Sequence, residues 1–548
     1  MKKSFTKAMP LLLAALTALT GCGQTKYSGD NAEPPVSSPE SVFKQQGAVS
    51  EEYETAMYAN DAGSLSMARK SPNFITTPEQ IPDFNTEEYS AITENSFKST
   101  VTDPLSTFSA DVDTACYSNL RRMIREGSEI PQDSVRIEEM INYFHYNYPE
   151  PNGNEPFSVT TELADCPWNS DTKLMMIGMK AKDIDMSERK PMNLVFLIDV
   201  SGSMYSYDKL PLVQKSFSML TEELNANDRI SIVTYAGEDS VVLEGASGSE
   251  GLRIREAIDS LEAGGATAGA AGINTAYDIA AKYFINGGNN RIILATDGDL
   301  NVGISSEAEL KRLVESKRDK GIFLSVLGFG TGNIKDNKME TLADNGNGNY
   351  SYIDSEIEAK RVLVEEMGGT LVTVAKDVKF QVEFNPAYIK GYRLIGYENR
   401  QLAAEDFNDD TKDAGEIGAG HTVTVLYEIA DINSKMDFSS SDLKYGDSSA
   451  KGTENGEFCT VSVRYKEPDG DTSKLLAYPV TESSRKAEMS DDLRFASSVA
   501  AFGLILRNSS NKGTANKNLV LSLIPESTRN DAYKQEFAEL VNAYKVAS

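Results

Sequence analysis

The chain is poor in the side chains on which most enzyme sites depend. Its 548 residues include only two histidines, His145 and His421. Neither lies in a metal-binding or catalytic-triad pattern, and we expect both to be ordinary surface histidines. The glycine-rich segment 264–272 lacks the lysine of a phosphate-binding loop, and close approach of backbone segments explains its glycines better. These absences predict that the protein is not an enzyme.

Cysteine is also scarce, with four residues in the whole chain. The spacing of Cys116, Cys166 and Cys459 does not match a zinc cluster. One disulfide with one thiol left over, and three buried reduced thiols, are both compatible with the sequence.

Positive charge is in deficit, because 54 Lys and Arg residues face 82 Asp and Glu residues, for a formal net charge of −28. A protein this acidic repels nucleic acid and anionic lipid surfaces at long range. We therefore expect no nucleic-acid partner.

Long apolar runs are rare: the run within Leu493 to Arg507 is too short to span a membrane, and near the start Met9 to Thr20 follows three lysines. This segment is too short to span a membrane and is typical of a signal peptide. The four residues that end at Cys22 resemble a bacterial lipobox, which implies that Cys22 becomes the lipidated first residue and that the mature charge is −31. The expected location is extracytoplasmic, anchored by lipid to a bacterial membrane; a plain secretory signal is the alternative.

The organising stretch of the chain is a buried strand followed by short polar residues. An apolar run, Leu194 to Ile198, ends at Asp199, and Ser201 and Ser203 follow on a tight loop. The carboxyl ends of such strands are where α/β sheets place their sites. Carboxylate and hydroxyl oxygens suit a small hard cation, although this five-residue pattern alone more often marks a simple turn.

Two further residues change that interpretation. Thr267 opens a helical stretch, and Asp297 ends a second buried strand. With Asp199, Ser201 and Ser203 they resemble the complete metal-ion-dependent adhesion site of von Willebrand factor type A domains. The resemblance implies a bound Mg²⁺, with Mn²⁺ or Ca²⁺ as alternatives, and one coordination position for an Asp or Glu side chain of a protein ligand. It also implies that the loops of Thr267 and Asp297 move when a ligand binds. The residues expected at the ligand-contact rim are Met204, Tyr205 and Asp299.

Alternating strands and helices between residues 191 and 374 predict an α/β fold with a doubly wound, mostly parallel sheet. Segments on both sides have a period of two, as in antiparallel sheets. The stretches from Asp103 and around His421 resemble the flanking modules of bacterial von Willebrand factor lipoproteins, from which Ala110 and Cys116 depart. We predict that the type A domain is inserted into one β-sandwich. The expected parts are a signal peptide (1–22), a disordered tether (23–100), an N-terminal module (101–190), the type A domain (191–374), a β-rich module (375–485) and a helical segment (486–548).

The favoured function is metal-dependent protein binding by a membrane-tethered adhesion or scaffold lipoprotein. A metal-stiffened structural protein of the cell envelope is the alternative. A metal-assisted hydrolase is a weaker one, because Asp239 and Asp299 are the only general bases expected near the loop.

Overall fold

The computed structural model describes residues 85–545 apart from 154, 265–269, 299–306, 413, 439–451 and 469. The predictions for the signal peptide, for Cys22, and for the tether before residue 85 lie outside these ranges. The described residues belong to one compact unit. Within the described ranges, no helix is both long and apolar enough to cross a membrane.

The centre of the type A domain is a six-stranded sheet in the order β10-β9-β8-β5-β6-β7. All neighbours are parallel except β6 and β7, so the predicted doubly wound sheet is confirmed. Its strands are β5 (Met192–Asp199), β6 (Arg229–Ala236), β7 (Glu238–Ser247), β8 (Asn289–Thr296), β9 (Ile322–Phe329) and β10 (Tyr350–Ile353).

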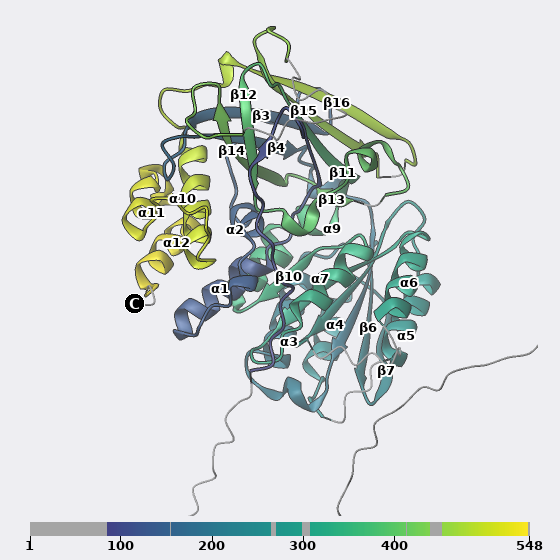
Figure 1. Ribbon diagram of the computed structural model, residues 1–548. Helices are drawn as coiled ribbons and strands as arrows, with labels where there is room; N and C mark the ends of the chain where they lie inside the picture. Colours follow the sequence, from purple (N-terminus) through teal and green to yellow (C-terminus); the bar gives the residue numbers. More distant parts are fainter. Residues whose placement is uncertain are drawn as a thin grey trace, which may run out of the picture. The chain divides into compact units, whose positions relative to one another are not determined.

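Helices cover both faces of this sheet (Figure 1). Strand β5 explains why, because Phe196 and Ile198 enter one hydrophobic core while Val195 and Leu197 enter the other. A strand buried on both faces needs this continuous apolar sequence. The first core uses α3 (Leu210–Glu222), α4 (Gly251–Asp259), α8 (Glu356–Lys360), the π-helical turn Arg361–Glu365 and α9 (Met367–Leu371). The second uses α5 (Ala270–Lys282), α6 (Glu307–Arg318) and α7 (Asp336–Asn345).

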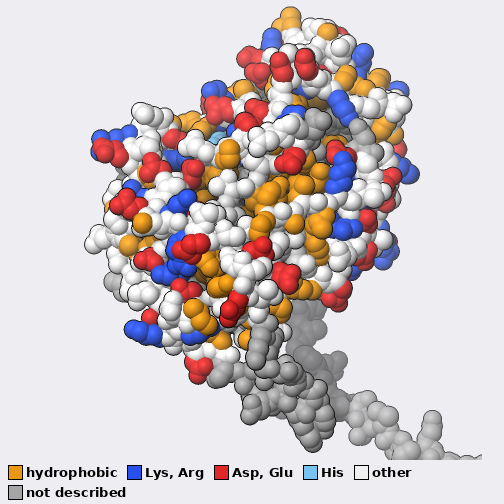
Figure 2. All heavy atoms as spheres, turned by 90° about the horizontal axis from the view of Figure 1, so that it is seen from above, with side chains coloured by type: hydrophobic (Ala, Val, Ile, Leu, Met, Phe, Trp, Pro, Cys, Tyr) orange, Lys and Arg blue, Asp and Glu red, His pale blue; other side chains and the backbone are white. Residues whose placement is uncertain are grey.

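Two antiparallel sheets are built from strands on both sides of the type A domain, which confirms the predicted insertion. Strand β4 precedes the domain and pairs with β14, and β2 pairs with β11 in the same way. One sheet comprises β1 (Lys98–Ser99), β12 (Ile389–Ile395), β14 (Thr422–Asp431), β4 (Lys173–Ala181) and β3 (Phe157–Asp165). The other comprises β13 (Gly415–Gly418), β11 (Thr373–Phe384), β15 (Glu457–Lys466), β16 (Ser473–Thr481) and β2 (Leu105–Ser109). Figure 2 shows the molecule from the side of this sandwich. On that face, hydrophobic side chains gather in a patch bordered by charged side chains of both signs.

A period-two pattern predicts strands with one solvated face, but β4 is buried on both faces. Met175 and Ile177 pack between the two sheets, whereas Leu174 and Met176 pack against helices on the other side. This second layer of helices, which period-two patterns do not reveal, is formed by α1 (Ala115–Glu126), α2 (Ile137–Asn142), α10 (Asp491–Leu506), α11 (Lys517–Leu523) and α12 (Ala532–Ala543).

The prediction of a disordered tether up to residue 100 is wrong for residues 85–99. The backbone N–H groups of Thr86 and Glu88 donate to the carbonyls of Gly332 and Ile334, both at 2.9 Å, and β1 joins a sheet. Residues 85–99 are therefore a docked arm, because these backbone bonds fix them to the folded part.

The structure also shows the state of three cysteines and the exposure of both histidines. Cys116, Cys166 and Cys459 are buried free thiols, which selects the reduced alternative. His145 is exposed, but the prediction of a surface position for His421 is wrong, because its ring is buried against Gly369.

Candidate metal centre

Asp199 ends β5 at the carboxyl edge of the parallel sheet, and the short turn Gly202–Tyr205 follows it. The backbone N–H of Ser201 donates to Asp199 Oδ1 at 2.8 Å, and this bond folds the loop back over the strand end. The Ser201 and Ser203 hydroxyls form a hydrogen bond with each other, and their Oγ atoms lie 2.9 Å apart. The sequence therefore brings three of the five predicted ligands together within five residues.

The two hydroxyls suit a small octahedral cation. Mg²⁺ binds oxygen at about 2.0–2.1 Å, which places neighbouring ligands about 2.9 Å apart. The Ser201 and Ser203 oxygens have this separation already. Asp199 and Ser201 are fully buried whereas Ser203 is exposed, so the loop is open to solvent on the Ser203 side.

Asp297 follows β8, the parallel neighbour of β5, and its side chain is buried. The Lys209 ammonium lies 2.8 Å from Asp297 Oδ2, in an ion pair that is itself largely buried. Lys209 precedes α3, and its aliphatic stem packs over Gly330. The sequence analysis missed this lysine, because no local spacing links residues 88 positions apart.

Burial raises the pKa of the Asp199 carboxyl to about 6, and the nearby Asp297 carboxylate adds to the rise. Hydrogen bonds from Ser201 act in the opposite direction. The Asp199 carboxylate is therefore costly to keep charged without a cation beside it.

The remaining predicted residues have different outcomes. Thr267 and Asp299 lie outside the described residues. Met204 was expected at the rim, but it is fully buried in a hydrophobic core and has no surface to offer. Tyr205 is 82% exposed, and Tyr207, which the sequence analysis did not single out, is 87% exposed.

The loop that contains Asp297 packs against the backbone of a second loop, residues 330–335. Gly298 has φ +105°, and a Cβ there would lie 2.5 Å from Asn333 O and 2.7 Å from Lys335 N. The N-terminal arm pairs with this same support loop (330–335) through Glu88 and Lys335. A single sequence does not predict such contacts between distant loops, and only the glycine at position 298 indicates a close approach of backbone here.

Comparison with known proteins agrees with this architecture. The "von Willebrand factor type A domain" family model matches residues 193–366, the span of the central sheet and its helices. "Uncharacterized protein YfbK" of Escherichia coli (strain K12) is 40% identical over 503 residues, which cover 89% of this chain and 87% of that protein. The chain belongs to the YfbK family of von Willebrand factor type A proteins.

Two more family models match the modules around the YfbK-family type A domain. "Uncharacterized protein YfbK, C-terminal" matches residues 369–546, and "von Willebrand factor" matches residues 83–176. "Inter-alpha-trypsin inhibitor heavy chain H3" of Homo sapiens is 26% identical over 33% of this chain and 22% of that protein. The solved structure "von Willebrand factor type A from Catenulispora acidiphila" is 15% identical with a TM-score of 0.40, over 72% of this chain and 92% of that chain.

Proposed function

We propose that this YfbK-family protein is a lipid-anchored, extracytoplasmic adhesion or scaffold protein that binds an Asp or Glu side chain of a protein partner through a divalent cation. The observation that carries the proposal is the pair of serine hydroxyls 2.9 Å apart beside the buried Asp199 carboxylate. Asp199, Ser201, Ser203, Thr267 and Asp297 would hold Mg²⁺, Mn²⁺ or Ca²⁺. When bound, the metal supplies a directional positive charge for a ligand carboxylate.

The charges at the site favour an anionic partner group. Asp199 and Asp297 contribute two negative charges, and Lys209 contributes one positive charge 2.8 Å from Asp297. With a divalent cation, the total is +1. One carboxylate from a partner neutralises this total, whereas a cationic group would be repelled.

We call the proposed metal-binding residues, 199–205 together with 297–298, the metal loop. The protein surface next to the metal loop favours a protein ligand over a free small anion. Tyr205 and Tyr207 are the two most exposed large apolar side chains of the described residues. Tyrosine is enriched among the residues that dominate protein interfaces. A partner that reaches Ser203 would pass beside Tyr205, and we expect both rings to lose solvent exposure on binding.

The membrane anchor is the part of the proposal that depends on Cys22. Lipidation there would leave the segment between Cys22 and the docked arm, which starts at residue 85, as the connection to the membrane. Replacement Cys22→Ser should move the protein from the membrane fraction to the soluble fraction of the cell envelope. Unchanged membrane association would contradict the anchor without affecting the metal site.

The test of metal-dependent binding uses the full-length chain in two stages. Mn²⁺ binding, followed by electron paramagnetic resonance, should show one site that Asp199→Ala abolishes. Asp259→Ala removes an exposed carboxylate at the end of α4 and should leave that site intact. Capture of envelope proteins should then depend on Mg²⁺, fail in EDTA, and fail with Asp199→Ala.

The outcomes separate the alternatives. Metal binding with no metal-dependent partner would support a structural protein stiffened by the ion. Partners that bind equally in Mg²⁺, in EDTA and to Asp199→Ala would overturn the metal-bridged function.

A further inference from the structure

The first residues of the docked arm, 85–89, lie beside the support loop (330–335), and we call them the arm tip. The backbone N–H groups of Thr86 and Glu88 donate to two carbonyls of that loop, both at 2.9 Å. The N–H of Asp336, just after the loop, donates back to Glu88 O at 3.1 Å. This alternation is the bonding of two parallel strands, so the arm tip pairs with the loop as a short strand would.

Side chains of the arm tip add to this pairing. The Glu87 side chain is 4% exposed, and its Oε1 accepts from the Gly332 N–H at 3.0 Å. Arg122 of α1 lies 3.0 Å from the same oxygen, and Lys335 Nζ lies 2.8 Å from Glu88 Oε1. Because one buried carboxylate binds the loop and a guanidinium together, the arm tip fixes the loop relative to α1.

The support loop also contacts the residue that follows Asp297. The carbonyls of Gly332 and Ile334 point to the arm tip, whereas the carbonyl of Asn333 lies against Gly298. A Cβ on Gly298 would lie 2.5 Å from that oxygen, so no side chain separates the two backbones. The loop therefore lies between the arm tip and a proposed metal ligand.

The same loop contacts the lysine of the metal centre. A Cβ on Gly330 would meet the aliphatic stem of Lys209, and Tyr352 Oη donates to the Gly330 carbonyl at 2.8 Å. The Lys209 ammonium pairs with Asp297 Oδ2. Both partners of this buried ion pair are thus in reach of a movement of the loop.

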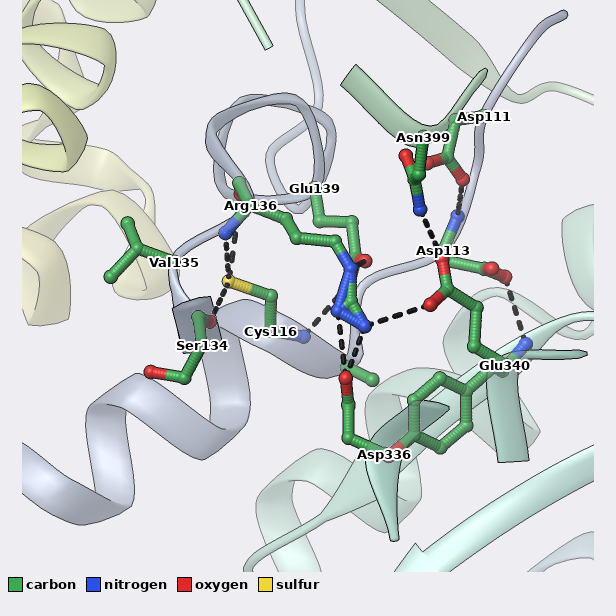
Figure 3. Close-up of polar contacts among 12 residues, drawn as sticks. Asp111, Asp113, Cys116, Ser134, Val135, Arg136, Glu139, Asp336, Glu340 and Asn399 are labelled. Carbon is green, nitrogen blue, oxygen red and sulfur yellow. Dashed lines mark hydrogen bonds and ion pairs between the residues drawn. The ribbon is translucent and has the colours of Figure 1, made fainter. Parts of the chain in front are cut away.

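The far end of the loop is fixed independently of the arm tip. Asp336 begins α7, and Arg136 of the N-terminal module donates to its carboxylate at 2.8 Å (Figure 3). The same guanidinium pairs with Glu340, one turn along α7, and with Glu139. Ile334 is buried in the second core of the type A domain. We therefore expect the loop to stay folded without the arm tip, but with greater freedom of movement.

The arm tip itself is lightly held. Thr86 and Glu88 are exposed, and segments with exposed hydrogen bonds and few buried apolar contacts open most readily. The later part of the arm is fixed to the sandwich, because Asn95 donates to two carbonyls at the end of β12 and β1 joins the sheet. The arm tip can therefore detach while the rest of the arm stays in place.

We propose that the arm tip is a latch on the metal centre: when docked, it makes the support loop hold Asp297 in place for the cation, and its release weakens cation binding. The inference rests on the proposed function and adds a control to it. Preorganised ligands bind a metal more tightly than mobile ones. With the anchor proposed at Cys22, a pull on the connection to the membrane acts on the latch before it reaches the sandwich.

The first test compares the Mn²⁺ affinities of full-length chains by electron paramagnetic resonance. Thr86→Pro combined with Glu88→Pro removes both N–H donors of the arm tip and leaves the support loop unchanged. We expect one Mn²⁺ site that binds roughly three- to tenfold more weakly than in the wild-type chain. Ser90→Pro changes an exposed arm residue beyond the paired ones and should keep the wild-type affinity. Equal affinities in the double variant and the wild type would overturn the latch.

The second test needs no variant in the arm. Coupling between two sites is reciprocal, so a cation that prefers the docked loop also strengthens docking. Hydrogen exchange at the N–H groups of Thr86, Glu88 and Gly332 should therefore slow when Mg²⁺ is added to the wild-type chain. It should not respond to Mg²⁺ in Asp199→Ala. A contact that only stabilises the fold would exchange at the same rate with and without Mg²⁺, and this result would overturn the proposal.

The two tests separate the latch from the proposed function. One Mn²⁺ bound by the wild-type chain, with no effect of the arm variant on affinity or of Mg²⁺ on exchange, would refute the latch and leave the metal centre intact. A wild-type chain that binds no Mn²⁺ would refute the metal centre, and the latch with it.

Discussion

The metal loop and the acidic junction, where α7 meets the N-terminal module and the loop after β12, both concentrate carboxylates. The two regions differ in how this negative charge is balanced. At the metal loop, one lysine pairs with Asp297, Asp199 lies nearby, and Ser203 is open to solvent. At the acidic junction, eight carboxyl side chains surround three arginines in a mostly buried volume. The members of this junction are Asp111, Asp113, Glu138, Glu139, Asp336, Glu340, Asp344 and Glu398 with Arg136, Arg400 and Arg507. The first arrangement is open to solvent at Ser203, whereas the second joins three parts of the chain.

The basic side chains of the two regions have different contacts. Lys209 balances a single carboxylate at the edge of a sheet. Arg136 and Arg400 hold α7 against the surrounding modules, because each contacts acids from more than one element. Similar side chains thus balance one carboxylate at the proposed metal site and hold modules together at the junction.

The largest effect should come from breaking the junction itself. Arg136→Met leaves three buried carboxylates without their shared cation, and loss of one partner of a buried ion pair costs about 3–5 kcal/mol. The midpoint of urea unfolding should fall accordingly. Lys215→Met breaks the exposed pair with Glu356 and should leave the midpoint nearly unchanged. Equal midpoints for the two variants would mean that the junction does not stabilise the fold.

At the metal loop, Gly298→Ala should be the most damaging glycine substitution. The new Cβ would meet the backbone of the support loop, and φ +105° is strained for alanine. We expect a loss of about 1–3 kcal/mol in unfolding free energy together with weaker Mn²⁺ binding. Gly332→Ala, at φ +83° with open space around it, should show the strain alone and retain Mn²⁺. Intact Mn²⁺ binding in Gly298→Ala would show that this support does not position Asp297.

The junction should also give the stability of the protein a pH dependence. Asp336 and Glu138 have raised pKa values in the fold, so the folded state holds protons that the unfolded chain has released. Their contribution is complete near pH 4 and is lost as the pH rises to about 7. Unfolding midpoints measured across this range should show a flatter dependence for Glu138→Gln. An identical slope in the variant would exclude Glu138 as a source.

The smallest predicted effect concerns metal affinity. Lys209→Met keeps the aliphatic stem over Gly330 but removes the charge beside Asp297. Two cations that share one carboxylate repel each other, so Mn²⁺ should bind more tightly, by roughly tenfold or less. Lys209→Arg keeps the charge and should not show this gain. Weaker Mn²⁺ binding in Lys209→Met would mean that the lysine positions Asp297 rather than competing with the metal.

The elements of the type A domain were predictable because their signals are local. The apolar run Leu194 to Ile198 predicts a buried strand. Asp199, Ser201 and Ser203 lie on one loop because they are close in sequence. The burial of Met204 was not predictable, since a single residue in a polar loop has no period. The second buried face of β4 depends on helices on both sides of it in the sequence, of which α10, α11 and α12 lie more than 300 residues away.

The sequence by itself determined the alternating α/β order, the insertion of the type A domain between paired strand segments, and four of the residues that lie at the metal loop. These features follow from short-range periodicity and from strand ends, which the backbone fixes locally. Only the tertiary structure decided that Lys209 reaches Asp297, that the arm from Thr86 supports the loop beside Gly298, and that the acids of α7 meet Arg136 and Arg400. Contacts of this kind join residues tens to hundreds of positions apart, and packing of the whole chain brings them together.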